Sequence, residues 1–304
     1  MNGVKIGKAE KYIRDKLDKD GAILLSLIDP DKHSFEKGAK IAQASAEAGA
    51  DVILVGGSIG AQGIVLDKTV KMIREKVNIP IILFPGNVGT ITPYADATYF
   101  MYLMNSREVY WMSTVQIQGA PIIKRMGIEP IPTGYIIVEP GKAVGWISNA
   151  NPVPRDRGDL AGATALAAQY MGARLIVTDA GSGAEQPATL KFVSTVKRMI
   201  DIPYIYGGGV RTPKQAADII EAGADGIQIG TAFEIDGDYK TIKTKISKMV
   251  KAIKAAGAKK KKARDGKFIT QTKKILPMLR IPGFDRSKLL KRWKTHQKSK
   301  QKRK

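Results

Sequence analysis

The chain has 304 residues, 43% of them hydrophobic and none of them cysteine, a composition that suits one large globular domain and excludes disulfides and thiolate metal sites. No stretch approaches the ~18 consecutive apolar residues of a membrane span, and the polar first ten residues lack the apolar segment of a signal peptide, so we expect a soluble protein of the reducing cytoplasm. The net charge of +22 is uneven, because residues 257–304 hold 19 Lys or Arg against two acids and carry +17 of it, whereas residues 1–256 carry +5.

Short apolar or β-branched segments alternate with amphipathic segments in residues 1–256. Eight expected strands lie at residues 23–28, 52–55, 80–84, 98–103, 133–138, 175–178, 203–206 and 226–229. Apolar residues recur at helical spacing between them, at residues 35–47, 60–76, 108–126, 159–171, 189–200 and 213–221. This order predicts an α/β fold, a closed parallel (β/α)8 or TIM barrel. Residues 85–97 are rich in Gly, Pro and Thr, so we expect a loop in place of the third helix.

The first two expected strands end in oxygen ligands, at the edge where the active site of a parallel barrel forms. Asp29, followed by a proline, is a rigidly placed carboxylate, and Ser58 follows the second strand. These two residues suit Mg²⁺, because Mg²⁺ usually binds few protein ligands and fills its other coordination positions with water and a diphosphate. Asp31 is more simply interpreted as an ordinary residue at the start of a helix, and His33 and His296 have no partner that would suggest a zinc site or a catalytic triad.

Aromatic and Met side chains concentrate at residues 98–104, 110–112 and 135–138. Such a cluster is typical of core, yet part of it also suits an apolar groove for a long hydrocarbon. If the groove exists, its depth is expected to depend on Tyr99, Phe100 or Tyr102.

Glycine-rich loops follow the last three expected strands, at residues 178–184, 207–211 and 230–234. Glycine lets backbone N–H groups approach an anion closely, and barrels often bind phosphate after strands seven and eight. We therefore predict a phosphate site here. Asp179 would be repelled by a phosphate and is predicted to bond a substrate hydroxyl and act as general base; the alternative is a cap on the turn.

A series of short motifs follows in sequence order: LIDPDK at 27–32, VGGS at 55–58, FPGN at 84–87, NS at 105–106, YW at 110–111, GYIIVEPG at 134–141, PVPRD at 152–156, AGSGA at 180–184, GGGVR at 207–211 and IGT at 229–231. Together these motifs resemble the geranylgeranylglyceryl phosphate synthase family, which includes the heptaprenylglyceryl phosphate synthases. The likeness extends over about residues 15–255 and is strongest for the branch that carries Tyr110-Trp111 and forms larger oligomers.

The resemblance implies a TIM-barrel prenyltransferase that joins geranylgeranyl diphosphate to the 3-hydroxyl of sn-glycerol 1-phosphate, forming an ether-lipid precursor of phospholipids. It implies Mg²⁺ on Asp29 and Ser58, catalysis by Asp179 and assembly into a dimer or hexamer. The residues implied to bind glycerol phosphate are Val177, Thr178, Asp179, Ala180, Gly181, Ser182, Gly183, Gly208, Gly209, Gly230 and Thr231.

The chain departs from the family pattern at Val177-Thr178-Asp179, where the family typically has Tyr-Leu-Glu. Asp179 keeps the carboxylate on a side chain one methylene shorter, and Val177 lacks the aromatic hydroxyl. Because a displacement of ~1 Å can cost a large factor in rate, we expect activity with an altered rate or acceptor preference.

Residues 257–304 are predicted to form a flexible basic tail outside the globular domain 1–256. Leu289, Leu290 and Trp293 fall on one side of a helix surrounded by basic residues, a pattern that suits an anionic membrane surface. Nucleic-acid binding and a solvated disordered tail are the alternatives, and nucleic acid is the less expected partner.

Two other functions share part of this pattern. Another phosphate-binding TIM-barrel enzyme, an isomerase or synthase, would have the glycine loops but would not need the Asp29 and Ser58 pair or an apolar groove. A non-catalytic basic protein that binds nucleic acid would have no use for Asp179 beside a phosphate loop.

Overall fold

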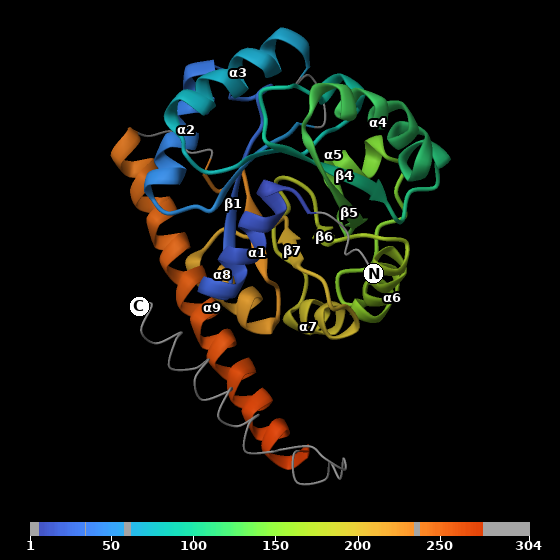
Figure 1. Cartoon of the computed structure of the whole chain (residues 1–304), viewed down its shortest axis with the longest axis vertical. Helices are drawn as coiled ribbons and strands as arrows, with labels where there is room; N and C mark the ends of the chain where they lie inside the picture. Colours follow the sequence, from blue (N-terminus) through green and yellow to red (C-terminus); the bar gives the residue numbers. More distant parts are fainter. Residues whose placement is uncertain (1–5, 34, 58–61, 234–237, 276–304) are drawn as a thin grey trace, which may run out of the picture. The chain divides into compact units, whose positions relative to one another are not determined.

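The computed structural model describes residues 6–33, 35–57, 62–233 and 238–275, with the backbone alone for residues 266–275. Eight parallel strands follow one another around a closed barrel, since β1 pairs with β8 as well as with β2 (Figure 1). They are β1 Ile23–Ile28, β2 Val52–Val55, β3 Ile81–Leu83, β4 Ala97–Leu103, β5 Glu129–Ile137, β6 Leu175–Asp179, β7 Tyr204–Gly207 and β8 Gly226–Ile229. The predicted TIM barrel is confirmed.

Helices surround the barrel. They are α1 Lys8–Asp20, α2 Phe35–Glu47, α3 Gly63–Lys76, α4 Val115–Met126, α5 Lys142–Ile147, α6 Gly158–Tyr170, α7 Leu190–Met199, α8 Pro213–Ala222 and α9 Tyr239–Ile275. Of these, α2, α3, α4, α6, α7 and α8 match the six predicted helical segments, whereas α1, α5 and α9 were not predicted. Between β3 and β4, a stretch described throughout, the only helical element is the 3-10 turn η1, Val88–Thr90, so the expected loop in place of the third helix is confirmed. A π-helical turn, η2 Tyr110–Thr114, precedes α4, so the segment expected to be one helix begins with a wider turn.

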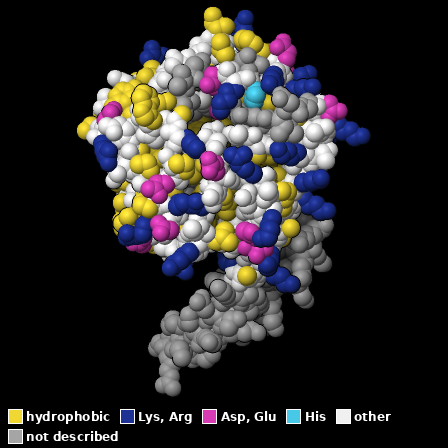
Figure 2. Space-filling view, turned by 180° about the vertical axis from the view of Figure 1, so that it is seen from behind, with side chains coloured by type: hydrophobic (Ala, Val, Ile, Leu, Met, Phe, Trp, Pro, Cys, Tyr) yellow, Lys and Arg dark blue, Asp and Glu magenta, His cyan; other side chains and the backbone are white. Residues whose placement is uncertain are grey.

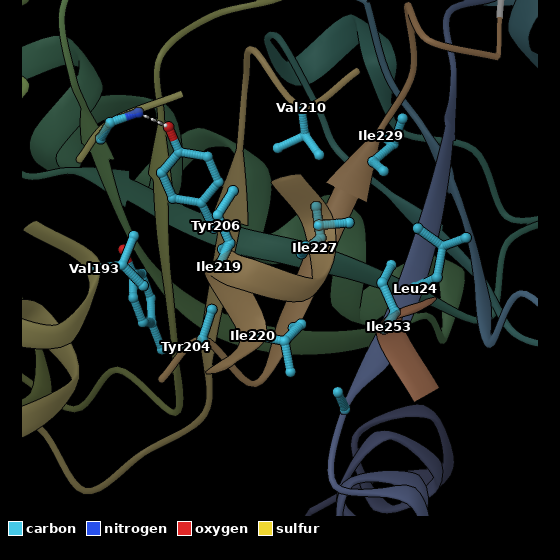
Figure 3. Packing of buried hydrophobic residues seen from close by; sticks show 14 of the residues in the cluster. Leu24, Val193, Tyr204, Tyr206, Val210, Ile219, Ile220, Ile227, Ile229 and Ile253 are labelled. Atoms are coloured by element: carbon cyan, nitrogen blue, oxygen red, sulfur yellow. Dashed lines mark hydrogen bonds between the residues drawn. The ribbon is translucent and has the colours of Figure 1, made fainter. Parts of the chain in front are cut away.

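Successive side chains along each strand point alternately into two apolar layers, one outside the barrel and one inside it. In Figure 3, outward side chains of β7 and β8 point toward α7 and α8; they include Tyr204, Tyr206, Ile227 and Ile229, packed with Val193, Ile219 and Ile220. Both tyrosines are buried with their hydroxyls bonded. Tyr204 Oη lies 2.7 Å from Thr178 Oγ1, and Tyr206 Oη accepts a hydrogen bond from the Ala188 N–H at 2.6 Å. These bonds avoid the cost of an unpaired buried hydroxyl, about 1–3 kcal/mol.

Inward side chains form a second cluster that α1 closes at the N-terminal ends of the strands. Ala9 and Ile13 of α1 are buried against this cluster, which contains residues of most strands. Glu129, at the start of β5, accepts the backbone N–H groups of Ala9 and Glu10 at 2.7 and 3.0 Å. The side chain of Glu129 thus satisfies two N–H groups that the first turn of a helix leaves without partners.

The N-terminal end of the barrel also carries partly buried ion pairs. Asp51 accepts the Leu24 N–H at 2.9 Å and pairs with Lys254 of α9 at 2.8 Å. Asp225 has the same place before β8, where it accepts the Tyr204 N–H at 3.0 Å. Its carboxylate pairs with two lysines, Lys197 at 2.7 Å and Lys260 at 2.9 Å.

The globular unit comprises residues 1–260, and residues 261–304 form a second unit. The expected boundary at residue 256 falls inside α9, which continues into the residues of the expected tail. Gly257, expected to mark the start of the tail, lies so close to β1 that a Cβ would be 2.7 Å from the Ala22 nitrogen. The predicted amphipathic segment at residues 287–296 lies outside the described residues, and the predicted flexibility of the tail stays a prediction. None of the helices, as far as the chain is described, is long and apolar enough to cross a membrane.

Charge on the globular unit is mixed. On the face seen in Figure 2, Lys and Arg side chains are interspersed with acidic and apolar ones. This agrees with the modest net charge of +5 for residues 1–256.

Candidate active site

A deep pocket opens at the C-terminal ends of the strands and has one polar and one apolar end. The polar end is formed by Asp29, Asp179, Ser182, Gly183, Gly208, Gly209, Arg211, Gln228, Gly230 and Thr231. The apolar end is formed by Phe84, Val88, Ile91, Tyr99, Phe100, Met101, Trp111, Val115, Ile123 and Val144. The C-terminal ends of several strands thus converge on one pocket.

Asp179 is the last residue of β6 and is buried in the pocket wall. Its Oδ1 accepts the Gly181 N–H at 2.7 Å. Its Oδ2 accepts hydrogen bonds from Gln228 Nε2 at 2.9 Å and from Tyr135 Oη at 3.2 Å. Burial raises the pKa of the Asp179 carboxyl, these three donors lower it by less, and the charge of Asp29 adds a smaller rise. A carboxyl with a raised pKa is a stronger base than an ordinary aspartate.

Tyr135 lies on β5, next to Val177 of β6 in the strand register. Burial, together with the charge of Asp179, raises the pKa of Tyr135 well above its ordinary value, so the phenol keeps its proton and acts as a donor. The aromatic hydroxyl that position 177 lacks is thus present on the neighbouring strand, bonded to the carboxylate of Asp179.

Three loops bring their backbones together beside Asp179. Gly208 and Gly209 have φ values of +84° and +73°, and a Cβ on Gly209 would lie 2.4 Å from the Gln186 carbonyl carbon. Only glycine fits this position, both sterically and conformationally. Ser182 Oγ lies 3.0 Å from Thr231 Oγ1, which joins the loop after β6 to the loop after β8. Backbone N–H groups and two hydroxyls at one place form a site suited to a phosphate.

The predicted phosphate ligands divide into two sets. Asp179, Ser182, Gly183, Gly208, Gly209, Gly230 and Thr231 line the pocket. Val177, Thr178, Ala180 and Gly181 are not among the lining residues. Successive strand residues point to opposite faces, so Val177 and Asp179 face the barrel interior and Thr178 faces outward, with its hydroxyl against Tyr204. The side chain of Thr178 therefore does not point toward the phosphate site.

Asp29 directly follows β1, lies in the wall of the same pocket and is 7% exposed. Lys32 Nζ donates to Asp29 Oδ2 at 2.9 Å. Ser58, the second predicted metal ligand, lies outside the described residues. No group of three or more His, Cys, Asp or Glu that could hold a metal occurs in the part of the chain that is described.

The apolar end of the pocket lies where the third helix is missing. Val88 and Ile91 approach α4 near Gly119, each with an atom 3.7 Å from where a Cβ of Gly119 would lie. A full helix after β3 would fill this space, so the short η1 turn leaves a groove between β4 and α4. Tyr99 and Phe100 line the groove as predicted, whereas Tyr102 turns its hydroxyl away to the Ala168 carbonyl at 3.1 Å.

Sequence reasoning missed Tyr135 and Gln228. Tyr135 belongs to an apolar segment and looked like core. Gln228 is the one polar residue of β8, and an amide in the middle of a buried strand was a signal that could have identified it.

Comparisons with known proteins agree with this geometry. The PcrB family profile matches residues 16–253. The chain is 47% identical over 251 residues to a geranylgeranylglyceryl phosphate synthase from Thermococcus kodakarensis, covering 83% of this chain and 99% of that protein. It is 49% identical over 234 residues to the synthase of the same name from Pyrococcus horikoshii, covering 77% and 92%. A crystal structure of (S)-3-O-geranylgeranylglyceryl phosphate synthase from Thermoplasma acidophilum, in complex with its substrate sn-glycerol-1-phosphate, matches with a TM-score of 0.77 at 36% identity, covering 83% of this chain and 100% of that one.

Proposed function

Because the chain belongs to the PcrB family, we infer its reaction from its relatives together with its own pocket. It is a prenyltransferase of lipid biosynthesis that joins geranylgeranyl diphosphate to the 3-hydroxyl of sn-glycerol 1-phosphate. A bond forms between the hydroxyl oxygen and C1 of the prenyl chain, and the bond from C1 to the diphosphate breaks, its electron pair leaving with the diphosphate. The observation that carries this assignment is a single pocket that joins an anion site to an apolar groove. Neither alternative function explains that groove.

The three glycine-rich loops are proposed to hold the acceptor phosphate. Ser182, Thr231 and the backbone of Gly208 and Gly209 provide donors at one end of the pocket. A phosphate fixed there would place the glycerol hydroxyls toward Asp179 in the adjacent wall. Holding both reactants in one orientation supplies much of the rate increase in such transfers.

Asp179 is proposed to be the general base. Its raised pKa and its place in the pocket wall suit it to accept the proton of the acceptor hydroxyl. The shorter side chain compared with glutamate is compatible with this role, because three donors hold the carboxylate in place.

Asp29 is proposed to bind Mg²⁺ near the diphosphate. Mg²⁺ commonly takes one or two carboxylates and completes its shell with water and substrate phosphates, so a single carboxylate in the pocket wall fits such a site. When bound, Mg²⁺ neutralises charge that develops on the departing diphosphate. Lys32, paired with Asp29, adds positive charge at the same place.

The groove between β4 and α4 is proposed to hold the prenyl chain. Its lining is apolar from Met101 and Trp111 to Ile91 and Ile123. Tyr99, 1% exposed at the edge of the barrel interior, is expected to limit how deep a chain can enter.

We propose that the protein forms a homo-oligomer, because large apolar side chains are exposed on the outer surface of the barrel. Val109, Ile117 and Trp146 are 71%, 72% and 83% exposed. Their segments are neighbours, since the Arg107 N–H donates to the Asn149 carbonyl at 3.0 Å. Light scattering after size-exclusion chromatography should give a multiple of 33.0 kDa, and Trp146→Glu should lower it.

The basic tail is proposed to attach this cytoplasmic enzyme to an anionic membrane, where its substrate and product dissolve. It follows Lys260, which contacts Ala224 and Asp225 at the N-terminal end of the barrel, opposite the pocket. Sedimentation with anionic vesicles should recover the full chain and lose a chain that ends at Lys260. Equal recovery of both would contradict the proposal, as would tail-dependent binding to RNA but not to vesicles.

The function is tested by transfer of labelled sn-glycerol 1-phosphate into an organic-extractable product with geranylgeranyl diphosphate and Mg²⁺. We expect product, its loss with EDTA, and a decrease of about 100-fold or more in Asp29→Ala. Asp31→Ala removes an exposed carboxylate two residues away and is the matched control, expected to retain activity. A folded protein that makes no product would contradict the assignment.

A further inference from the structure

Three residues on adjacent strands lie at one level of the barrel interior. Asp179 of β6 is the register partner of Gly207 of β7, which is the partner of Gln228 of β8. A Cβ on Gly207 would lie 2.8 Å from Gln228 Nε2 and 3.0 Å from Asp179 Cγ. The absence of a side chain at Gly207 is therefore what allows the side chains of β6 and β8 to meet across β7.

The side-chain amide of Gln228 uses its nitrogen to bind Asp179, whereas its oxygen is left without a donor among the described residues. Gln228 is 4% exposed, and its Nε2 donates to Asp179 Oδ2 at 2.9 Å. Its Oε1 is buried and has no hydrogen-bond partner among the residues that the structure describes. A buried, unpartnered amide oxygen is unfavourable for stability, so Gln228 is poorly explained as a structural residue. The N–H that it gives to Asp179 is its one evident contribution.

The hydrogen bonds at Asp179 distinguish its two oxygens. Oδ2 accepts from both Gln228 Nε2 and Tyr135 Oη, which uses its two lone pairs. Oδ1 accepts only the Gly181 N–H among the bonds found in the described residues. The lone pair that is left for a further donor is therefore on Oδ1.

We propose that Gln228 is a positioning residue for prenyl transfer, which with Tyr135 saturates Oδ2 of Asp179 and keeps Oδ1 directed at the acceptor hydroxyl. This inference rests on the proposed role of Asp179 as general base. In the reaction, the hydroxyl proton moves to Oδ1 as the oxygen bonds to the prenyl carbon and the diphosphate leaves. In this role Gln228 acts through Asp179.

The test compares Gln228→Met, which keeps the length and removes the donor, with Gln116→Met. Gln116 lines the same pocket and also has an unpartnered Oε1, but its Nε2 donates to the Met101 and Trp111 carbonyls. Two quantities are measured: steady-state kinetics against sn-glycerol 1-phosphate, and the pKa of Asp179 in the ligand-free protein. The second comes from carboxyl carbon NMR, with the resonance assigned by its absence in Asp179→Asn.

In Gln228→Met we expect kcat to fall about 10- to 100-fold while KM for sn-glycerol 1-phosphate changes less than about threefold. Loss of a donor to the ionised form raises the pKa of Asp179, so the acidic limb of the kcat profile moves to higher pH. In Gln116→Met that limb stays at its wild-type position. An Asp179 resonance that titrates at the wild-type pH in folded Gln228→Met would overturn the proposal.

Two features keep this test decisive. The NMR titration needs no substrate, so it stands even if the wild-type protein transfers no prenyl group and the proposed function fails. If Gln228→Met does not fold, Gly207→Ala replaces it, because its backbone conformation accepts alanine and the new methyl would push Gln228 away from Asp179. The same rise in the pKa of Asp179 is expected, and an unchanged pKa would refute the inference.

Discussion

Two aspartates at opposite ends of the barrel, the buried Asp179 and the partly buried Asp225, have pKa values that are shifted in opposite directions. Burial is the largest influence on both and raises the pKa of each. At Asp225, the positive charges of Lys260 and Lys197 outweigh it, and the pKa is lowered. At Asp179, neutral donors offset only part of it, and the pKa is raised.

The difference bears on which end of the barrel contributes stability and which end is proposed to carry out the reaction. A partly buried carboxylate paired with two ammonium groups has its charge satisfied and is a weak base. A buried carboxylate held by neutral donors keeps its ability to take a proton. Asp225 lies just before β8, and Asp179 is the last residue of β6. This placement is expected if parallel barrels place stability at the N-terminal face and chemistry at the C-terminal face.

The largest effect is expected from Asp179→Asn. Without a base, kcat should fall by about a thousandfold. The free energy of unfolding should stay equal or rise, because the substitution removes a buried charge. Prenyl transfer and urea unfolding of the same preparation measure both quantities. Retained activity would show that another group takes the proton.

Asp225→Asn is expected to lower stability and leave activity nearly unchanged. Leaving Lys197 and Lys260 without their shared carboxylate should lower the free energy of unfolding by about 2 kcal/mol. The kcat of the folded protein should stay within about twofold of wild type, since the pocket is at the other end. Asp218→Asn, which breaks the exposed pair with Lys214, is the control and should change stability by less than about 0.5 kcal/mol. If Asp225→Asn and Asp218→Asn lowered the free energy of unfolding equally, Asp225 would have no special role in stability.

The smallest effect is expected from Ser182→Ala. One hydroxyl donor to the acceptor phosphate would be lost while the backbone donors remain, so KM for sn-glycerol 1-phosphate should rise about threefold to tenfold with kcat nearly constant. Ser194→Ala on α7, whose hydroxyl bonds its own helix, should leave KM unchanged. A change in kcat alone would place Ser182 nearer the reacting atoms than the phosphate.

The fold was predictable because burial patterns along strands and helices are local. Eight strands and the missing third helix followed from apolar segments and from the glycine and proline content of residues 85–97. Three helices were not expected: α1, α5 and α9, the last of which extends into residues that were predicted to form a flexible tail. The polar α1 buries few residues, and α5 is only six residues long, so neither has a strong apolar repeat.

The site was predictable where topology alone brings residues together. Asp29, Asp179 and the glycine loops follow strands, and a parallel barrel gathers those ends. Side-chain direction within a strand was harder to predict. Thr178 was assigned to the site, although alternation from Asp179 turns it outward. The pairing of Asp179 with Gln228 depends on the register of three strands and on the space at Gly207, which no local pattern encodes.

The contrast between the two aspartates is tested most directly by following activity and folding together as the pH falls from about 7 to about 3. The raised pKa means that Asp179 takes its proton above 3.8, the ordinary value, and kcat should fall with it. The lowered pKa of Asp225 means that its stabilising contribution, present above 3.8, is lost only as the pH falls through that lower value. We therefore expect a pH range in which circular dichroism shows a folded protein and kcat is largely lost. Activity that persists until the protein unfolds would contradict Asp179 as the base.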